Sequence, residues 1–317
     1  MAFPDFRSIK HTAYQRLEHA PNARRLIIVH AIVPAVISLV LTVFSYLLSQ
    51  QIEGTGGLGG LGLRSVLESA QSMLQVLSMI FSLFWAYGMH RIALRWSRGE
   101  QAQDADLLAG FHHFGAVLRT GLLQAFLYFA MVFVALQISS LIFSMTPLAG
   151  PMLELTQQIL DDPNFMPTDA ALLDAMIPYL PFLLVCLVLM VVPLFYRLRM
   201  MEFVLMDMPQ HGALHAYRAS KLLMRGNCIR LLKVDLKFWW FYLLEILTAC
   251  LFYGDLALPL FGIDLGLSAD TLFFAACILG LTAQTALYIW RKNHIMTAYA
   301  LVYQALLPQE GNEAREI

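Results

Sequence analysis

The chain has 317 residues, of which 59% are hydrophobic and only 14% are charged. Soluble domains usually carry about 25% charged residues, so this composition excludes an ordinary soluble protein. The net charge of −1 argues against a polyanionic partner, and we expect no nucleic-acid binding. Apolar stretches and basic clusters alternate along the chain, which indicates a multi-pass membrane protein.

Six apolar stretches are long enough to cross a bilayer. The hydrocarbon core is about 30 Å thick and requires about 20 mostly apolar residues in a helix. The first stretch is longer than the apolar core of a cleaved signal peptide, so we expect it to stay as a membrane helix. The sequence predicts an all-α polytopic membrane protein, a single domain with spans at about 26–48, 69–90, 120–144, 179–200, 234–254 and 270–290.

Basic residues are segregated among the connections between these spans. Twenty of the 21 Lys and Arg residues lie at the two ends of the chain or in the second-to-third and fourth-to-fifth connections, and only Arg64 falls elsewhere. Because Lys and Arg concentrate in cytoplasmic loops, both termini are predicted to be cytoplasmic. Residues 145–178 then form a long extracytoplasmic loop with room for a short helix near 150–160. Residues 54–62 are Gly-rich and expected to be irregular, and residues 307–317 form a flexible cytoplasmic tail.

Three cytoplasmic connections are alike in form. Each reads as a short interfacial amphipathic helix, a break and an Arg before the next span, with breaks at Pro21, Gly115 and Gly226. This pattern suggests three copies of a unit made of an interfacial helix and a helical hairpin. Unrelated hairpins under the same topological rules would also look partly alike, so both interpretations stay open.

The segment 213–225 is the clearest surface helix, since Pro209 and Gly212 precede it and Gly226-Asn227 follows as a typical C-cap pair. A basic amphipathic helix beside a membrane usually lies in the interface, with its cations near anionic lipid headgroups. A docking platform for a cytosolic partner or a specific lipid is the more specific interpretation. The basic residues of this surface are Arg218, Lys221, Arg225, Arg230 and Lys233.

No metal, cofactor or catalytic motif is evident. Asp207, His211 and His215 have the i, i+4, i+8 spacing that would place metal ligands on one helix face, but Pro209 and Gly212 interrupt that helix. The four cysteines have neither CxxC nor zinc spacing. We therefore expect no metal site, no cofactor and no enzymatic activity.

Glu245 is the one acidic residue deep inside an apolar stretch. It lies eight residues beyond Lys237, about 12 Å along a helix, too deep for its side chain to reach water easily. A functional Glu245 would line a polar path and bind a proton or cation. A structural Glu245 would hydrogen-bond another helix, with Gln124, Gln137 or Gln284 as partners. The lack of an evident cationic partner favours the structural role.

Several motifs in the second half of the chain belong together. They are Asp207-Met208-Pro209, Ser220 in an Ala-rich helix, Met224-Arg225-Gly226-Asn227 and Leu236-Lys237-Phe238-Trp239. In these motifs the chain resembles the DUF975 family of bacterial integral membrane proteins, a family of unknown function, and its two ends are similar to that family's opening and closing segments. The resemblance implies a helical bundle in the bacterial cytoplasmic (inner) membrane and carries over no catalytic residue.

Two functions remain open. The first is a non-enzymatic scaffold or accessory factor that binds lipids, or a membrane or cytosolic protein partner, through its basic cytoplasmic face. The second is a small secondary transporter or channel with Glu245 in a polar intramembrane path. A water-accessible cavity reached by Glu245 favours transport, whereas a sealed centre filled with Leu and Phe favours the scaffold. The sequence ranks the scaffold first, because its recognisable motifs concentrate on the basic face.

Overall fold

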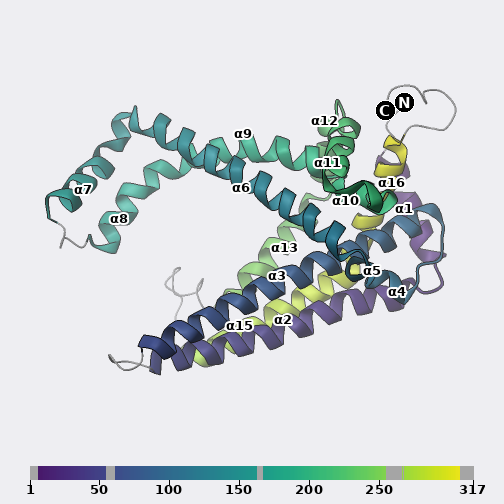
Figure 1. Cartoon of the computed structure of the whole chain (residues 1–317), viewed down its shortest axis with the longest axis horizontal. Helices are drawn as coiled ribbons and strands as arrows, with labels where there is room; N and C mark the ends of the chain where they lie inside the picture. The colour runs from purple at the N-terminus through teal and green to yellow at the C-terminus, as the bar shows by residue number, and fades with distance from the viewer. Residues whose placement is uncertain (1–5, 55–60, 163–166, 255–265, 267, 308–317) are drawn as a thin grey trace.

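The computed structural model describes residues 6–54, 61–162, 167–254, 266 and 268–307. Every element within these ranges is a helix, and no described residue lies in a β-strand, which confirms the all-α class. A segment inside a bilayer must satisfy its own backbone N–H and C=O groups, and a helix does so within one segment. Helices from distant parts of the chain meet at one end of the molecule and diverge from it (Figure 1).

Five helical stretches are long and apolar enough to cross a membrane. Only 11% to 28% of their most apolar windows is buried inside the protein, which leaves most of their surface for lipid. These features indicate a multi-pass membrane protein. The helices that form these stretches are α2 (Ala23–Gly54), α3 (Leu61–Arg98), α6 (Phe114–Ser144), α9 (Leu180–Leu198) and α15 (Ala269–Leu287).

The span predicted at 234–254 is shorter in the structure. The apolar helix there, α13 (Trp239–Phe252), has 14 residues, fewer than the about 20 needed to cross a hydrocarbon core. The residues before it form a separate amphipathic helix, α12 (Cys228–Lys237), because the chain turns at Phe238. The described residues therefore contain five helices of spanning length, where the sequence predicted six.

The last spanning helix extends well beyond its predicted end at residue 290. It passes through one π-helical turn, η5 (Tyr288–Lys292), into α16 (Asn293–Leu306). No Gly or Pro occurs between residues 281 and 306, so nothing in the sequence breaks the helix. A π-helical turn inside an α-helix is often found at a functional site.

The long helices form two groups. α6 and α9 pack along each other as a hairpin, whereas α2, α3, α13 and α15 form a bundle in which α15 contacts both α2 and α13. The hairpin and the bundle meet where α3 contacts α6, and they diverge toward the left of Figure 1. Phe126, Phe129 and Leu189 on the hairpin are 66%, 71% and 68% exposed, as expected for a surface that faces lipid.

Shorter helices close the end where the two groups meet, which we call the converging end. α1 (Phe6–Glu18), α10 (Met201–Asp207) and α11 (Gly212–Leu223) join α16 and the last part of α3 there. Trp96, Met200 and Tyr303 are almost fully buried in this region. Two clusters of buried apolar residues in the described structure thus both include residues of this end, one with Trp96 and the other with Met200 and Tyr303.

Three arginines of the predicted second-to-third connection form ion pairs inside the converging end. Arg91 and Arg95 lie 3.2 Å and 3.0 Å from the carboxylate oxygens of Asp106 in α4 (Asp104–Leu107). Arg98 donates from one nitrogen to both carboxylate oxygens of Asp207, at 2.7 Å and 2.8 Å. These side chains therefore hold α3 against α4 and α10, a role that a topology signal alone does not require.

The three helix entrances differ from one another. Gly226 turns the chain after α11 with φ of +78°, as predicted, but it leads into α12 rather than into a span. The break predicted at Gly115 was wrong, because Gly115 lies inside α6. The chain breaks instead at His113, between α5 (Ala109–His112) and α6. The entrances thus lack a common geometry, and the threefold repeat remains a prediction.

The long connection at 145–178 contains two helices. α7 (Gly150–Asp161) confirms the helix expected near 150–160, and α8 (Asp169–Met176) follows it. Single turns of 3-10 helix complete the described elements: η2 (Pro147–Ala149), η3 (Ile177–Tyr179) and η4 (Pro209–His211). The predictions of an irregular Gly-rich connection and of a flexible tail fall largely outside the described residues, at 55–60 and 308–317.

Candidate functional site

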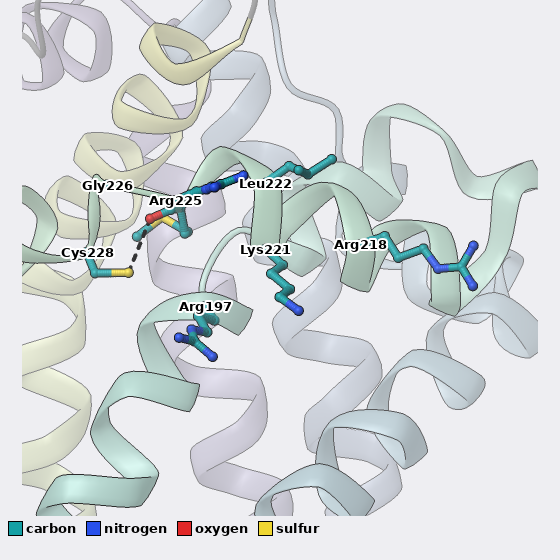
Figure 2. A pocket seen from close by; sticks show the side chains of 8 residues that line it. Arg197, Arg218, Lys221, Leu222, Arg225, Gly226 and Cys228 are labelled. Carbon is teal, nitrogen blue, oxygen red and sulfur yellow. Dashed lines mark hydrogen bonds between the residues drawn. The ribbon is translucent and has the colours of Figure 1, made fainter. Parts of the chain in front are cut away.

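A basic pocket of about 570 Å³ lies between α11 and the end of α9. Lys221 extends from α11 to the level of Arg197, whereas Arg218 points away from both (Figure 2). Among the described residues, no Asp or Glu lines this pocket. Its lining consists of Arg197, Arg218, Lys221, Leu222, Met224, Arg225, Gly226 and Cys228.

The backbone beneath these cations is held firmly. Ser220 is fully buried, and its Oγ donates a hydrogen bond of 2.7 Å to the carbonyl oxygen of Arg197. This bond ties α11 to the end of α9. Asn227 Nδ2 donates to the carbonyl oxygen of Leu223 at 3.0 Å, beside the left-handed Gly226. Gly226 thus lines the pocket, whereas Ser220 and Asn227 fix the backbone next to it. All three belong to motifs noted in the sequence.

The basic pocket collects three of the five predicted surface cations: Arg218, Lys221 and Arg225. Arg230 and Lys233 lie on α12 and are not part of its lining. The fourth pocket cation, Arg197, lies in the last turn of α9 and was not among the predicted surface cations. None of the four pocket cations has a carboxylate within ion-pair distance in the described part of the chain. Four cations without a carboxylate partner around one pocket favour an anionic ligand.

α12 carries an uncovered apolar stripe beside this pocket. Ile229, Leu232 and Leu236 recur at helical spacing and are 69%, 37% and 59% exposed. Arg230 and Lys233 are exposed on the same short helix. An exposed apolar stripe next to cations is typical of a helix that lies in the bilayer interface, so the basic pocket lies close to the expected level of lipid headgroups.

Glu245 has a cationic partner that the sequence did not reveal. Its Oε1 accepts hydrogen bonds from Lys292 Nζ at 3.0 Å and from Tyr288 OH at 2.8 Å. Gln284 Nε2 donates to the same Tyr288 hydroxyl at 3.2 Å. The interpretation of Glu245 as a carboxyl without a cation was therefore wrong. Of the three glutamines considered, Gln284 joins this hydrogen-bonded chain, through Tyr288.

Close helix packing creates this pair. α13 and α15 lie side by side, and a Cβ at Gly280 of α15 would lie 2.4 Å from the Cα of Phe252 in α13. Gly280 therefore permits an approach that any larger residue would obstruct. Gln284, Tyr288 and Lys292 follow at intervals of four residues, which places them on one helix face. This spacing is the signal in the sequence that leads to Lys292.

Glu245 and Lys292 line a cavity of about 500 Å³ between the hairpin and the bundle, which we call the Glu245 cavity. The side chain of Glu245 is 28% exposed, so the carboxylate reaches open space rather than a sealed apolar centre. Both helix groups contribute to the lining. Its other polar residues include His90, Gln124, Arg199, Glu202, Tyr242 and Tyr299.

Further ionisable side chains around the Glu245 cavity lie close to polar or aromatic neighbours. His90 Nδ1 of α3 lies 2.9 Å from the carboxylate of Glu202 in α10. The guanidinium of Arg199 stacks on the rings of Phe195 and Tyr299, with its carbon 4.8 Å and 4.4 Å from their centroids. Cation–π contact of this kind stabilises a desolvated cation by about 2 kcal/mol. The cavity thus combines acidic and basic groups on opposing helices.

A tyrosine–aspartate network supports Arg199. Asp235 of α12 accepts a hydrogen bond of 2.7 Å from Tyr196 and another from Tyr299. The hydroxyls of Tyr242 and Tyr299 are also hydrogen-bonded, at 2.6 Å. These contacts connect α9, α12, α13 and α16, and they fix the aromatic ring on which Arg199 rests.

The remaining predicted residues lie apart from one another. Gln124 lines the Glu245 cavity, whereas Gln137 lies 13 residues further along α6, is exposed and is not in that lining. Asp207 binds Arg98 and accepts a hydrogen bond of 2.9 Å from Tyr303, so its carboxylate already has partners. The described residues contain no group of three or more potential metal ligands.

No protein-family model, no curated protein and no solved structure matches the chain. The resemblance to the DUF975 family therefore rests on the sequence motifs alone.

Proposed function

We propose that the protein is a small secondary transporter of the bacterial inner membrane, in which Glu245 binds and releases a proton within a polar path. The observation that carries this proposal is the Glu245–Lys292 pair at the wall of the Glu245 cavity. Ionisable groups within membrane segments are costly, and they commonly mark ion and proton paths. An open, polar cavity at Glu245 reverses the ranking that the sequence favoured, because a scaffold does not need one.

The charge pairs supply a mechanism for coupling. An ionised Glu245 attracts Lys292, and protonation of Glu245 removes that attraction. The His90–Glu202 pair connects α3 of the bundle to α10, which follows α9 of the hairpin. A change of protonation at either pair therefore alters a contact near the junction of the two helix groups, and the angle between the groups can respond.

In the proposed topology the converging end faces the cytoplasm, because it carries most of the basic clusters. Both termini are then cytoplasmic, which requires an even number of crossings. α13 is the sixth crossing in this topology. Its 14 residues cover about 21 Å at 1.5 Å per residue, less than the about 30 Å of a hydrocarbon core, so this crossing requires local thinning of the bilayer. Its packing against α15 supports a membrane position.

Proton uptake by proteoliposomes tests this function. Vesicles that enclose a pH-sensitive dye receive a potassium diffusion potential, negative inside, with valinomycin present. We expect the purified full-length protein to admit protons faster than protein-free vesicles. Glu245→Gln should abolish this excess, since an amide cannot carry the proton.

Glu154→Gln is the matched control, because Glu154 is an exposed carboxyl on α7, away from the Glu245 cavity. It should transport like the wild type. Equal proton uptake by the wild type, Glu245→Gln and empty vesicles would contradict the proposal.

A second candidate function is the binding of anionic lipid headgroups in the basic pocket, and the four unpaired cations there favour it. We expect Lys221→Gln/Arg225→Gln to weaken phosphatidylglycerol binding about 30-fold, at about 1 kcal/mol for each lost cation. Titration of the detergent-solubilised protein, followed by native mass spectrometry, measures this. Arg230→Gln/Lys233→Gln removes two cations outside the pocket, and an equal loss in that variant would exclude a specific pocket.

A further inference from the structure

A third cavity, of about 700 Å³, lies within the bundle among α2, α3, α13 and α15. Its polar lining comes mainly from two helices and is uncharged throughout the described residues. We call it the hydroxyl–amide cavity. α2 contributes Ser38, Thr42, Ser45 and Ser49, and α3 contributes Gln71, Gln75, Ser78 and Ser82.

The polar residues follow the same spacing on both helices. On α2 and on α3 they recur at intervals of four, three and four residues, so each set occupies one helix face. Both faces border the same cavity. A surface that only faces lipid or packs against an apolar neighbour has no need for eight polar residues in matching register.

The hydroxyl groups alone do not require a ligand. Ser49 Oγ and Ser82 Oγ each donate a hydrogen bond of 2.8 Å to a carbonyl of their own helix, as serine often does inside membrane helices. The amides of Gln71 and Gln75 differ, because neither has a hydrogen bond to another described residue. Gln71 is half-buried and Gln75 is exposed, so at this level of a bilayer each amide would meet either lipid or the contents of the cavity. An amide without a partner in an apolar medium costs about 2–7 kcal/mol, so these side chains need water or a polar ligand there.

The hydroxyl–amide cavity and the Glu245 cavity follow one another along the bundle. On α3, Ser82 lines the former, and Ala86 and His90 line the latter. Ser82 and Ala86 are one helical turn apart, about 6 Å. On α15 and its extension, Cys277 lines the first cavity and Lys292 the second. The two cavities thus share helix faces, and their linings change from uncharged to charged toward the converging end.

We infer that the hydroxyl–amide cavity is a water-filled entrance that binds a small, uncharged, hydrogen-bonding solute on its way to the Glu245 cavity. Among the described residues its lining offers donors and acceptors but no charged side chain, and the carboxylate of Asp270, outside the lining, accepts a hydrogen bond from the lining residue Tyr46. A bare ion would lose far more hydration energy than a neutral polar molecule. The movement of the solute from this cavity to the Glu245 cavity rests on the proposed transport function. The occupation of the hydroxyl–amide cavity by water and polar solute does not depend on that function.

Cysteine modification in proteoliposomes of the full-length protein tests this inference. The probe is 2-hydroxyethyl methanethiosulfonate, a neutral, hydroxyl-bearing reagent of the inferred solute class. Thr42→Cys and Gln75→Cys place thiols in the cavity, and Ser45→Cys replaces either variant if it fails to fold. Val40→Cys and Val76→Cys are controls at similar depth, because Val40 and Val76 are 60% and 55% exposed outside the cavity lining. Peptide mass spectrometry quantifies each site, so the native cysteines can stay.

We expect the cavity thiols to react at least about tenfold faster than the controls, since the thiolate is the reactive form and does not form readily in hydrocarbon. Equal rates at cavity and control positions would overturn the inference. Modification of the cavity thiols only after the protein has been dispersed to monomers would also overturn the inference. That result would mean that a second copy of the chain, rather than water, covers the amides in the membrane. Modification requires no transport, so a failure here is distinct from a failure of proton uptake.

Discussion

At the residue scale, Lys292 determines how the charge of Glu245 is compensated. Its ammonium lies 3.0 Å from Oε1 and also 5.6 Å and 4.8 Å from the ring centroids of Phe241 and Tyr288. The two side chains are 24% and 28% exposed. The pair is therefore shielded from solvent without being sealed, an environment in which the removal of one partner is costly.

Lys292→Met removes the cation and keeps the apolar stem. A fully buried pair loses about 3–5 kcal/mol when one partner is removed. Because this pair is partly exposed, we expect a smaller loss, about 1–2 kcal/mol. Thermal unfolding in detergent measures the change. Lys233→Met on the exposed face of α12 is the control, and an equal effect of both variants would contradict a stabilising pair.

The sequence identifies Glu245 as unusual, but it does not reveal which residues surround Glu245. Depth was counted from Lys237, yet the chain turns at Phe238, so this count did not follow one continuous helix. Lys292 lies just beyond the predicted end of the last span and was counted as a topology marker. Its contact with Glu245 depends on the pairing of α13 with α15, which no local pattern specifies.

At the scale of elements, glycines that look alike in the sequence have different roles. Gly226 has φ of +78°, where a side chain is strained, so Gly226→Ala should destabilise the protein by about 1 kcal/mol. Gly115 is helical and a Cβ there would meet nothing within 4 Å. Gly115→Ala should therefore be neutral or slightly stabilising. Thermal unfolding of both variants measures this, and equal destabilisation would contradict the assigned conformations.

Gly280 controls the distance between α13 and α15. A Cβ there would lie 2.4 Å from a backbone atom of Phe252, so Gly280→Ala must force the helices apart. We expect a loss of about 1–3 kcal/mol, the usual cost of overpacking. Gly254→Ala is the matched control, because its Cβ would lie 3.4 Å from Ala276 Cβ. Comparable unfolding temperatures for the two variants would show that the close approach is not needed.

The sequence predicts the elements better than their ends. Apolar length located all five helices of spanning length, because about 20 apolar residues have few alternatives to a membrane helix. It did not predict that α3 continues to Arg98, since ion pairs with Asp106 and Asp207 stabilise that extension. It also misplaced the break near Gly115, because a glycine permits a turn without requiring one.

At the scale of the whole molecule, the division into hairpin and bundle is not visible in the sequence. Both groups consist of apolar helices with similar composition, and lipid covers either group equally well. Their arrangement depends on contacts at the converging end, where α3, α6 and α11 meet. Those contacts join residues far apart in the chain, such as Arg98 and Asp207.

The proposed orientation predicts the sides of two exposed positions. Glu154→Cys on α7 should react with a membrane-impermeant maleimide in intact cells. Arg230→Cys on α12 should react only after the cells are lysed, because the basic end is cytoplasmic in this topology. The opposite pattern would invert the topology. Labelling of both positions in intact cells would mean that α9, which lies between them in the chain, does not cross the membrane.

The central claim is that Glu245 lies in an aqueous path rather than in a sealed helix contact. The most direct test is the reaction of Glu245→Cys with a membrane-impermeant thiosulfonate in proteoliposomes, with Ile246→Cys as the control. Ile246 is the next residue of α13 and is 61% exposed on its lipid-facing flank. We predict rapid modification of Glu245→Cys and little of Ile246→Cys. Equally slow modification of both positions would contradict the account.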